Sequence, residues 1–241
     1  MDALIYSAMA GAERALKAQQ VRANNLANAG TTGFRADMEM AAHQAVEGFG
    51  YDARHMARLE ADTVQMRHGA LTATGRALDA AIDGDGLFTV ADGNGEAYTR
   101  AGSFTLDAEG RLQLAGRPVV GEGGPIVLPA SGHYEIGADG SVLALAIGTQ
   151  EMQVIDRLKL VRPESGTLRK NEAGLLVPRD GQPLAPSDEV QVRGGHLETS
   201  NVSPIEEMVA TLQLNRDFEL QMKLFKAADE MASHGNRLMR D

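Results

Sequence analysis

The chain has 241 residues, enough for one large domain or two smaller ones. Its 33 acidic residues outnumber 23 basic residues, and the net charge of −10 argues against general binding to nucleic acid or anionic membranes, whose phosphates it would repel. The absence of cysteine excludes disulfides, thiolate zinc sites and cysteine nucleophiles, and an aromatic content of 4% is low for a large ligand pocket.

A long amphipathic helix is predicted near the start of the chain, over residues 3–28. Its apolar side chains recur close to a heptad spacing, which is typical of a helix that packs against another helix. These side chains belong to Ile5, Met9, Ala12, Leu16, Ala23 and Leu26. Gly11 weakens an isolated helix by roughly 1 kcal/mol relative to alanine, so we expect the order of this segment to depend on partners.

Three asparagines lie where this helix is expected to end, namely Asn24, Asn25 and Asn28. Their side chains either satisfy backbone groups at the helix end or simply terminate the helix, and the sequence leaves both interpretations open. Gly30 and Gly33 are expected to stop the helix. Phe34 then supplies a single large apolar anchor after a flexible turn.

This first segment does not resemble a secretory leader, because Asp2 and Glu13 interrupt it and no basic region precedes a continuous apolar core. We therefore expect that, if the protein acts outside the cytoplasm, it leaves by a route that does not cleave a leader peptide. No stretch of the sequence is apolar enough and long enough to span a bilayer.

The pattern changes twice between the two ends of the chain. Residues 36–75 mix alanine, methionine and charged residues without a sustained period, and we interpret them as a linker with one short helix near residues 37–47. From residue 78 to about residue 196, short runs alternate with turn residues every 8–12 positions, which predicts an antiparallel sheet or barrel. The longest expected strand covers residues 153–161, and Gly110 is expected to take a left-handed conformation in a hairpin loop.

A second long helix is predicted from Ser203 onward, because serine at the N-cap, Pro204 and Glu206 form a capping box. Two apolar faces follow. The first contains Ile205, Met208, Val209 and Leu212, and the second contains Leu214, Phe218, Met222, Phe225, Ala228 and Ala232. Two faces on one helix predict contacts on more than one side, as in a packed array of several chains.

These patterns predict an α+β protein in which N- and C-terminal amphipathic helices form a coiled-coil-like pair and flank a central antiparallel β-rich domain. We expect an N-terminal helical segment over residues 1–35 and a linker over 36–75. A β-rich middle domain is expected over 76–196, followed by a C-terminal helical segment over 197–241 that packs with the first. The terminal stripes alone fit the core helices of a monomer equally well.

The sequence contains no recognisable catalytic or metal-binding constellation. The six histidines are scattered without an HExxH pair, and no GxSxG is present. Residues 83–86 and 92–94 have the aspartate and glycine of calcium loops, but they lack the later glycine and glutamate of an EF-hand, so we interpret them as turns. We predict no catalytic residue, cofactor or metal, and no small-molecule substrate or nucleic-acid partner.

Three segments resemble signatures of the bacterial flagellar basal-body rod and hook proteins. They are ANNLANAGTTGFR over residues 23–35, TGRALDAAIDGDGLF over 74–88, and LETSNVSPIEEM over 197–208. Within the family, the short length and the segments at 5–9, 121–126 and 203–206 are most similar to the proximal rod proteins. Residues 36–75 depart from the pattern.

The resemblance implies a structural subunit whose terminal helices assemble into a hollow drive shaft that transmits torque and encloses the export channel. The implied partners are other rod proteins, further copies of the chain and the flagellar type III export apparatus, and the implied location is the rod crossing the periplasm. Each helix alone is marginal in water, so we expect it to become ordered when neighbouring subunits bury its stripes through head-to-tail contacts. The alternatives are a distal rod or hook subunit, a surface adhesin-like β-protein, and an enzyme.

The residues expected at the assembly interface come from both ends of the chain. They are Ile5, Met9, Leu16, Asn24, Asn25, Leu26, Asn28, Phe34, Ile205, Met208, Val209, Leu212, Phe218, Met222 and Phe225.

Overall fold

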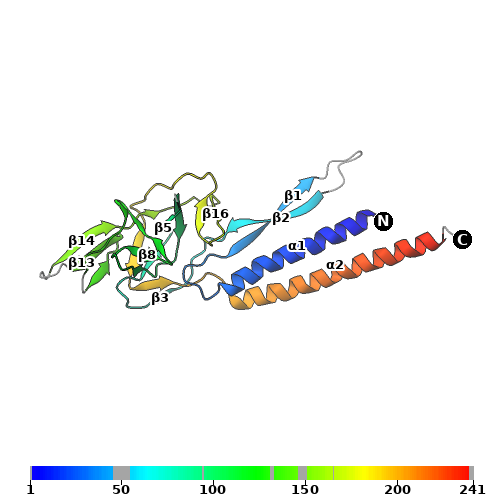
Figure 1. Cartoon of the computed structure of the whole chain (residues 1–241). Helices are drawn as coiled ribbons and strands as arrows, with labels where there is room; N and C mark the ends of the chain where they lie inside the picture. The colour runs from blue at the N-terminus through cyan, green and yellow to red at the C-terminus, as the bar shows by residue number, and fades with distance from the viewer. Residues whose placement is uncertain are drawn as a thin grey trace. The chain divides into compact units, whose positions relative to one another are not determined.

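A computed structural model describes residues 2–45, 55–93, 95–130, 133–145, 151–164 and 166–238. Two long helices lie near the two ends of the chain and an antiparallel β-rich region lies between them, which confirms the predicted α+β class (Figure 1). The chain forms two compact units. The first combines Met1–Ala27, Asp37–Thr63 and Ser203–Asp241, and the second combines Asn28–Ala36 with Val64–Val202.

The first unit contains helix α1 (Asp2–Ala27) and helix α2 (Pro204–Leu238), which lie side by side along their length (Figure 1). They run antiparallel, since Gly11 lies against Gln221 while Asn25 hydrogen bonds to Glu207. Both helices begin and end close to the predicted boundaries because the sequence signals are local. In particular, the Ser203 hydroxyl accepts a hydrogen bond from the Glu206 N–H at 3.5 Å, as the capping box predicts.

Small side chains form the α1 side of the seam between these helices. Ala8, Ala15 and Ala18 are buried, with Gly11 between them. A Cβ at position 11 would lie 2.9 Å from Cδ of Gln221, so the two backbones approach closely there. The seam therefore lies one residue away from the predicted heptad stripe, and the larger side chains of that stripe are not part of it. The predicted stripe was chosen from the larger apolar side chains, whereas two closely packed helices place small residues at their contact.

The same unit contains a two-stranded sheet in place of the short helix expected near residues 37–47. Strand β1 (Asp37–Ala45) pairs with strand β2 (His55–Val64) in a two-stranded sheet, so the helix prediction is wrong over the described part of that range. Residues 46 and 47 lie outside the described residues. Alanine and methionine are good helix formers, but helix propensity is a weak signal, and pairing with the next segment of the chain, His55–Val64, overrides it here.

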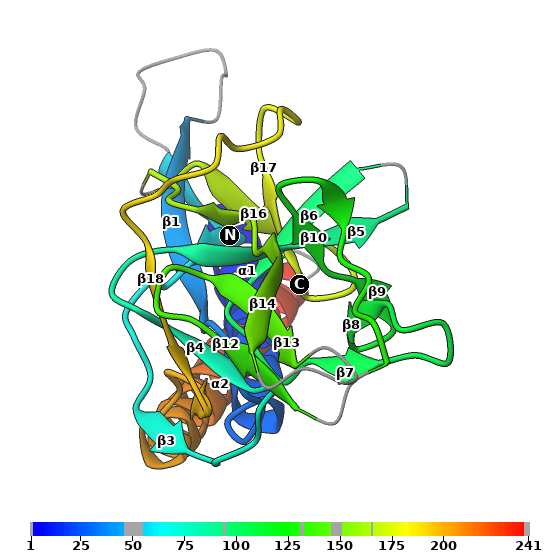
Figure 2. The ribbon, with the colours of Figure 1, turned by 90° about the vertical axis from the view of Figure 1, so that its left-hand side faces the viewer.

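The second unit consists of short strands joined by turns (Figure 2). The strands are β3 (Leu71–Ala73), β4 (Ala80–Asp83), β5 (Leu87–Asp92), β6 (Gly95–Thr99), β7 (Thr105–Leu106), β8 (Leu112–Leu114), β9 (Arg117–Pro118), β10 (Val120–Gly121), β11 (Gly124–Pro125), β12 (Tyr134–Ile136), β13 (Ser141–Leu145), β14 (Met152–Arg157), β15 (Leu160–Val161), β16 (Leu168–Lys170), β17 (Leu176–Pro178), β18 (Gln191–Gly194) and β19 (His196–Glu198). The largest sheet has the order β15-β5-β6-β17-β16, and β12, β13 and β14 form a three-stranded sheet.

The core of this unit packs around Phe88 and Phe104, whose rings meet edge to face at 5.2 Å between centroids. Gly110 has φ of 80°, which confirms the left-handed turn predicted between two strands. The single long strand predicted over residues 153–161 is divided into β14 and β15. Leu158, between the two strands, is buried, donates its N–H to the Gly140 carbonyl and forms an isolated bridge with Gly121.

Candidate assembly site

Helix α2 carries two apolar faces, and only one of them packs against α1. Leu214, Phe218 and Phe225 are half-buried and Ala228 is buried. The other face lies in the first turns and is exposed to solvent, with exposed fractions of 74% at Ile205, 51% at Met208, 50% at Val209 and 60% at Leu212. Nine residues separate Ile205 from Leu214, which at about 100° per residue places them on opposite sides of the helix.

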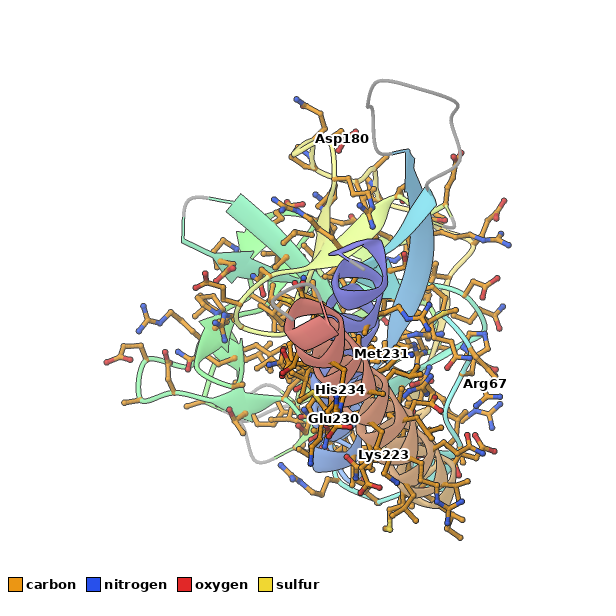
Figure 3. The ribbon with its side chains drawn as sticks, turned by 90° about the vertical axis from the view of Figure 1, so that its right-hand side faces the viewer. Arg67, Asp180, Lys223, Glu230, Met231 and His234 are labelled. Carbon is orange, nitrogen blue, oxygen red and sulfur yellow. The ribbon has the colours of Figure 1, made fainter. Side chains whose placement is uncertain are left out.

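The exposed apolar residues continue farther along α2, where they alternate with charged side chains. Leu220, Met222, Leu224 and Met231 are each about half exposed or more. Figure 3 shows Lys223, Glu230, Met231 and His234 along the same helix. Met222 was expected to share a face with Phe218 and Phe225, but it lies on the flank of that face because it is one residue past Gln221, which faces α1.

Helix α1 also presents apolar side chains to solvent. Met9 is 56% exposed and Leu16 is 46% exposed, while Leu26 is half-buried. An ion pair between Lys17 and Glu13, at 2.8 Å, lies among them on the surface. The side chain of Ile5 lies outside the described residues.

A polar layer, made by Arg22, Asn25 and Glu207, closes the seam where α1 ends and α2 begins. Arg22 Nη1 lies 3.3 Å from both carboxylate oxygens of Glu207, and Asn25 Nδ2 donates to Glu207 Oε1 at 3.5 Å. Asn25 also donates to the carbonyl of Asp37 at 3.0 Å and accepts from the Asp37 N–H at 2.8 Å. Asn24 donates to Asp37 Oδ2 at 2.7 Å.

The polar layer decides part of the question that the sequence left open about the asparagines. Asn25 satisfies backbone groups, but those of β1 rather than those of its own helix end. Asn28 has a different role, since its side-chain oxygen accepts from the Thr31 hydroxyl at 3.2 Å in the turn after α1. Arg22 and Glu207 were missed. The signal was present, because Arg22 and Asn25 lie seven residues after two alanines of the seam, Ala15 and Ala18.

In the second unit, the segment that follows α1 is held against the β-structure. Phe34 is half-buried, and Nζ of Lys170 lies 3.8 Å from the centroid of its ring. Lys170 also donates to the Arg35 carbonyl at 2.6 Å. Gly33 has φ of 68° and a Cβ there would lie 2.2 Å from the backbone nitrogen of Ala101, so no other residue fits without displacing the chain.

A buried ion cluster joins the two chain segments that lead to the helices. Arg35 Nη2 lies 2.7 Å from Glu198 Oε1, and Arg100 Nε lies 3.5 Å from Glu198 Oε2, with side chains at most 2% exposed. Neither guanidinium is aligned for a hydrogen bond to the carboxylate, so charge attraction holds the cluster. Gly69 donates its N–H to Glu198 Oε1 at 2.8 Å, and Arg100 donates to the Ile82 carbonyl at 3.2 Å.

The electrostatics of this cluster follow from two cations that share one anion. Burial lowers the pKa of Arg100 to about 10, Glu198 and Asp85 raise that pKa, and Arg35 lowers it. Nearby, the Asn201 side chain accepts from the Ala36 N–H at 2.8 Å and donates to two backbone carbonyls at 2.9 Å each. Neither the cluster nor Asn201 was predicted from the sequence, because Glu198 lies 98 positions or more from both arginines and Asn201 lies more than 130 positions from its partners.

Among the described residues, no group of three histidine or acidic side chains is placed to hold a metal ion, and no helix is long and apolar enough to cross a membrane. A groove of about 330 Å³ is lined by Arg76, His133, Tyr134 and Glu135 together with glycines, and it contains no serine, threonine or cysteine that could act as a nucleophile.

These features define a class of protein whose two chain ends pair as helices and whose β-rich unit lies between them in sequence. Three family models match the chain in this order: Flagella basal body rod protein at residues 5–35, Flagellar hook protein FlgE/F/G D1 domain at 81–144, and Flagellar basal body rod FlgEFG protein C-terminal at 193–238.

Full-length relatives agree with these matches. The chain is 37% identical to flagellar basal-body rod protein FlgF of Salmonella typhimurium and 36% identical to FlgF of Escherichia coli, in both cases over 99% of each chain. It is 30% identical to rod protein FlgG of Bacillus subtilis over 94% of this chain and 95% of the relative. The chain belongs to the FlgF family of flagellar basal-body rod proteins. It is a structural subunit of the rod in the flagellar basal body, where it assembles with other rod components.

Proposed function

We propose that the chain builds the wall of the proximal rod through the outward faces of its two terminal helices. The observation that carries the proposal is the exposed face of α2 at Ile205, Met208, Val209 and Leu212, on the side opposite α1. Exposed apolar residues that cluster on one face indicate a surface that another molecule covers. Met9 and Leu16 supply a second such surface on α1.

The energetics favour many small contacts. Burial of one such aliphatic side chain contributes about 1.5–3 kcal/mol. An interface between subunits that buries several of them can therefore be stabilised mainly by apolar contacts. Two different faces that meet head to tail generate a helical array rather than a closed dimer. Phe218 and Phe225 lie on the face toward α1, so we assign them to the helix pair within one chain.

The array encloses a channel and transmits torque as a stiff shaft, because each subunit is bound on more than one side. Each terminal helix is marginal alone, and contact with neighbours completes its order. The subunit reaches this site through the flagellar type III export channel and forms part of the rod that crosses the periplasm. We assign it no enzymatic activity and no small-molecule substrate, because the relatives it matches are rod proteins of the flagellar basal body.

Charged residues placed on the exposed face test the proposal. We would express Val209→Glu with Leu212→Glu in a motile strain whose own copy of the gene is deleted, and Gln213→Glu as the matched control at an exposed position off that face. We expect the double variant to be stable and exported but to leave the rod incomplete and the cells non-motile. Motility equal to that of the control would contradict assembly through this face.

A further inference from the structure

The seam between α1 and α2 contains one polar layer, and we propose that Arg22, Asn25 and Glu207 select the register in which the two helices pair. The register is the assignment of which residue of α1 faces which residue of α2. Two approaches define it, Gly11 with Gln221 and Asn25 with Glu207. Both intervals are 14 residues, from 11 to 25 and from 207 to 221, so the two helices keep one register over two heptads.

The apolar part of the seam does not select this register. On the α1 side it consists of small residues that repeat every three or four positions: Ala8, Gly11, Ala15 and Ala18. A slide by one heptad still sets one phenylalanine on small residues: Phe225 moves from Ala8 to between Gly11 and Ala15 in one direction, and Phe218 moves from between Gly11 and Ala15 to Ala8 in the other. In coiled coils with uniform seams, a polar residue at a single position removes this ambiguity.

The polar layer distinguishes the registers because Glu207 is buried, with 9% of its side chain exposed. A slide of seven residues in one direction places its carboxylate beside Ala18, where the seam offers alanines in place of Arg22 and Asn25. A slide in the other direction carries Glu207 past Ala27, the last residue of α1, and sets Asn25 against Leu214. Both slides separate buried polar groups from their partners, which is strongly unfavourable.

Strand β1 holds the layer in position. The amide of Asn25 makes two hydrogen bonds to the backbone of Asp37, at 3.0 Å as donor and 2.8 Å as acceptor. These bonds fix which end of the amide faces Glu207, so Asn25 cannot rotate to follow a shifted carboxylate. The layer therefore joins α1, α2 and β1 within the first unit.

A single register has a consequence for assembly, and this consequence rests on the proposed function. One heptad corresponds to about 10 Å along a helix axis. A slipped pair would move the exposed face at Ile205 and Val209 by that distance past Met9 and Leu16. Neighbouring subunits would then meet a surface to which they are not complementary.

Introduced cysteine pairs measure the register directly, because the chain has no cysteine of its own. Gly11→Cys with Gln221→Cys reports the observed register. Gly11→Cys with Ala228→Cys reports a slide of one heptad, and it carries Gln221→Ala to remove the side chain that a Cβ at position 11 would meet. The readout is the rate of intramolecular disulfide formation in the full-length monomer, followed on non-reducing gels.

With the polar layer intact, we expect the first pair to form its disulfide more than about tenfold faster than the second. When Arg22, Asn25 and Glu207 are all replaced by leucine, we expect the two rates to fall within about threefold of each other. The matched control introduces three leucines at exposed polar positions of the same helices, Arg14→Leu, Gln20→Leu and Glu219→Leu, and should retain the discrimination.

A charge exchange covers the case in which the leucine variant loses its helices, as judged by circular dichroism. Glu207→Arg alone sets two arginines together and should lower the rate of the first pair, whereas Arg22→Glu combined with Glu207→Arg should restore it. Equal rates for both pairs with the layer intact would overturn the proposal. So would full discrimination in a folded leucine variant, which would show that the chain connections set the register, or failure of the exchanged pair to restore it.

Discussion

Glu198 lies at the centre of the ion cluster that joins the segment after α1 to the segment before α2. Its carboxylate lies between the guanidiniums of Arg35 and Arg100 and accepts the N–H of Gly69. A buried pair of like charges is tolerated only because an opposite charge lies between them. Arg35 and Glu198 are 163 positions apart in the chain, so this one side chain ties the exit of α1 to the entry of α2 within the second unit.

We expect Glu198→Gln to reduce the free energy of unfolding of the second unit by about 3 kcal/mol or more, because the two buried cations Arg35 and Arg100 lose the buried anion that they share. Chemical denaturation followed by circular dichroism measures the change. Glu189→Gln is the control, since Glu189 forms an exposed ion pair with Arg162 at 2.8 Å and such pairs contribute about 1 kcal/mol or less. Equal effects of the two substitutions would show that the cluster is not held by its charges.

A second prediction for a single residue concerns Tyr98 and the pH dependence of stability. Burial raises the pKa of Tyr98 to about 12, the Leu184 N–H that donates to its hydroxyl lowers the pKa, and Glu96 raises it. An unfolded tyrosine titrates near pH 10, so between pH 10 and 12 the unfolded chain releases a proton that the folded chain keeps. Stability should therefore fall as pH rises through this window. Tyr98→Phe should reduce that pH dependence, and an unchanged slope would contradict the assignment.

At the scale of whole elements, α1 and α2 differ in how they use their apolar residues. Helix α1 directs alanines and a glycine toward the seam, whereas α2 directs leucine and phenylalanine side chains there. Small residues on one helix leave room for large residues on the other, which lets the pair pack closely. The remaining large apolar side chains of both helices consequently face solvent and are available to neighbours.

Ala18→Leu tests this division of roles. Ala18 is buried in the seam, so added volume should separate the helices and destabilise the pair by about 1–3 kcal/mol. Ala23→Leu is the matched control at an exposed position of the same helix and should have a much smaller effect. Hydrogen exchange of α2 amides over residues 214–228 measures both. Faster exchange in the control than in Ala18→Leu would contradict the assigned seam.

The features of the fold and of the candidate site that could be predicted from the sequence are those encoded by residues close together in the chain. The helix start at Ser203 and the turn at Gly110 are encoded by adjacent residues, and both predictions are confirmed. The strand β1 was missed because its alanines and methionines favour a helix when that segment is taken alone. The Glu198 cluster was missed because its members belong to separate segments. The apolar face of α2 at Val209 was predicted because it repeats within one helix.

For the molecule as a whole, the two units differ in what their stability depends on. The second unit has its own core around Phe88 and Phe104. The first unit consists of two helices and a hairpin, and much of its apolar surface remains exposed in the single chain. We therefore expect order in the helices to increase when neighbouring subunits cover that surface.

Hydrogen exchange on the purified monomer should show this difference. We expect faster exchange over residues 2–27 and 204–238 than in the strands of the second unit, because local stability follows the amount of buried apolar contact. Comparison with assembled basal bodies should then show slower exchange in the helices. Equal and strong protection of both units in the monomer would mean that the helix pair is self-sufficient, and ordering on assembly would have to be abandoned.

The central claim is that the outward face of α2 becomes buried between subunits of the rod. The most direct measurement is maleimide labelling of Val209→Cys, the only cysteine in that variant, in the free monomer and in purified basal bodies. The account predicts rapid labelling in the monomer, protection in intact basal bodies, and full labelling again after the basal bodies are dissociated. Equal labelling of the monomer and the intact basal body would contradict assembly through this face.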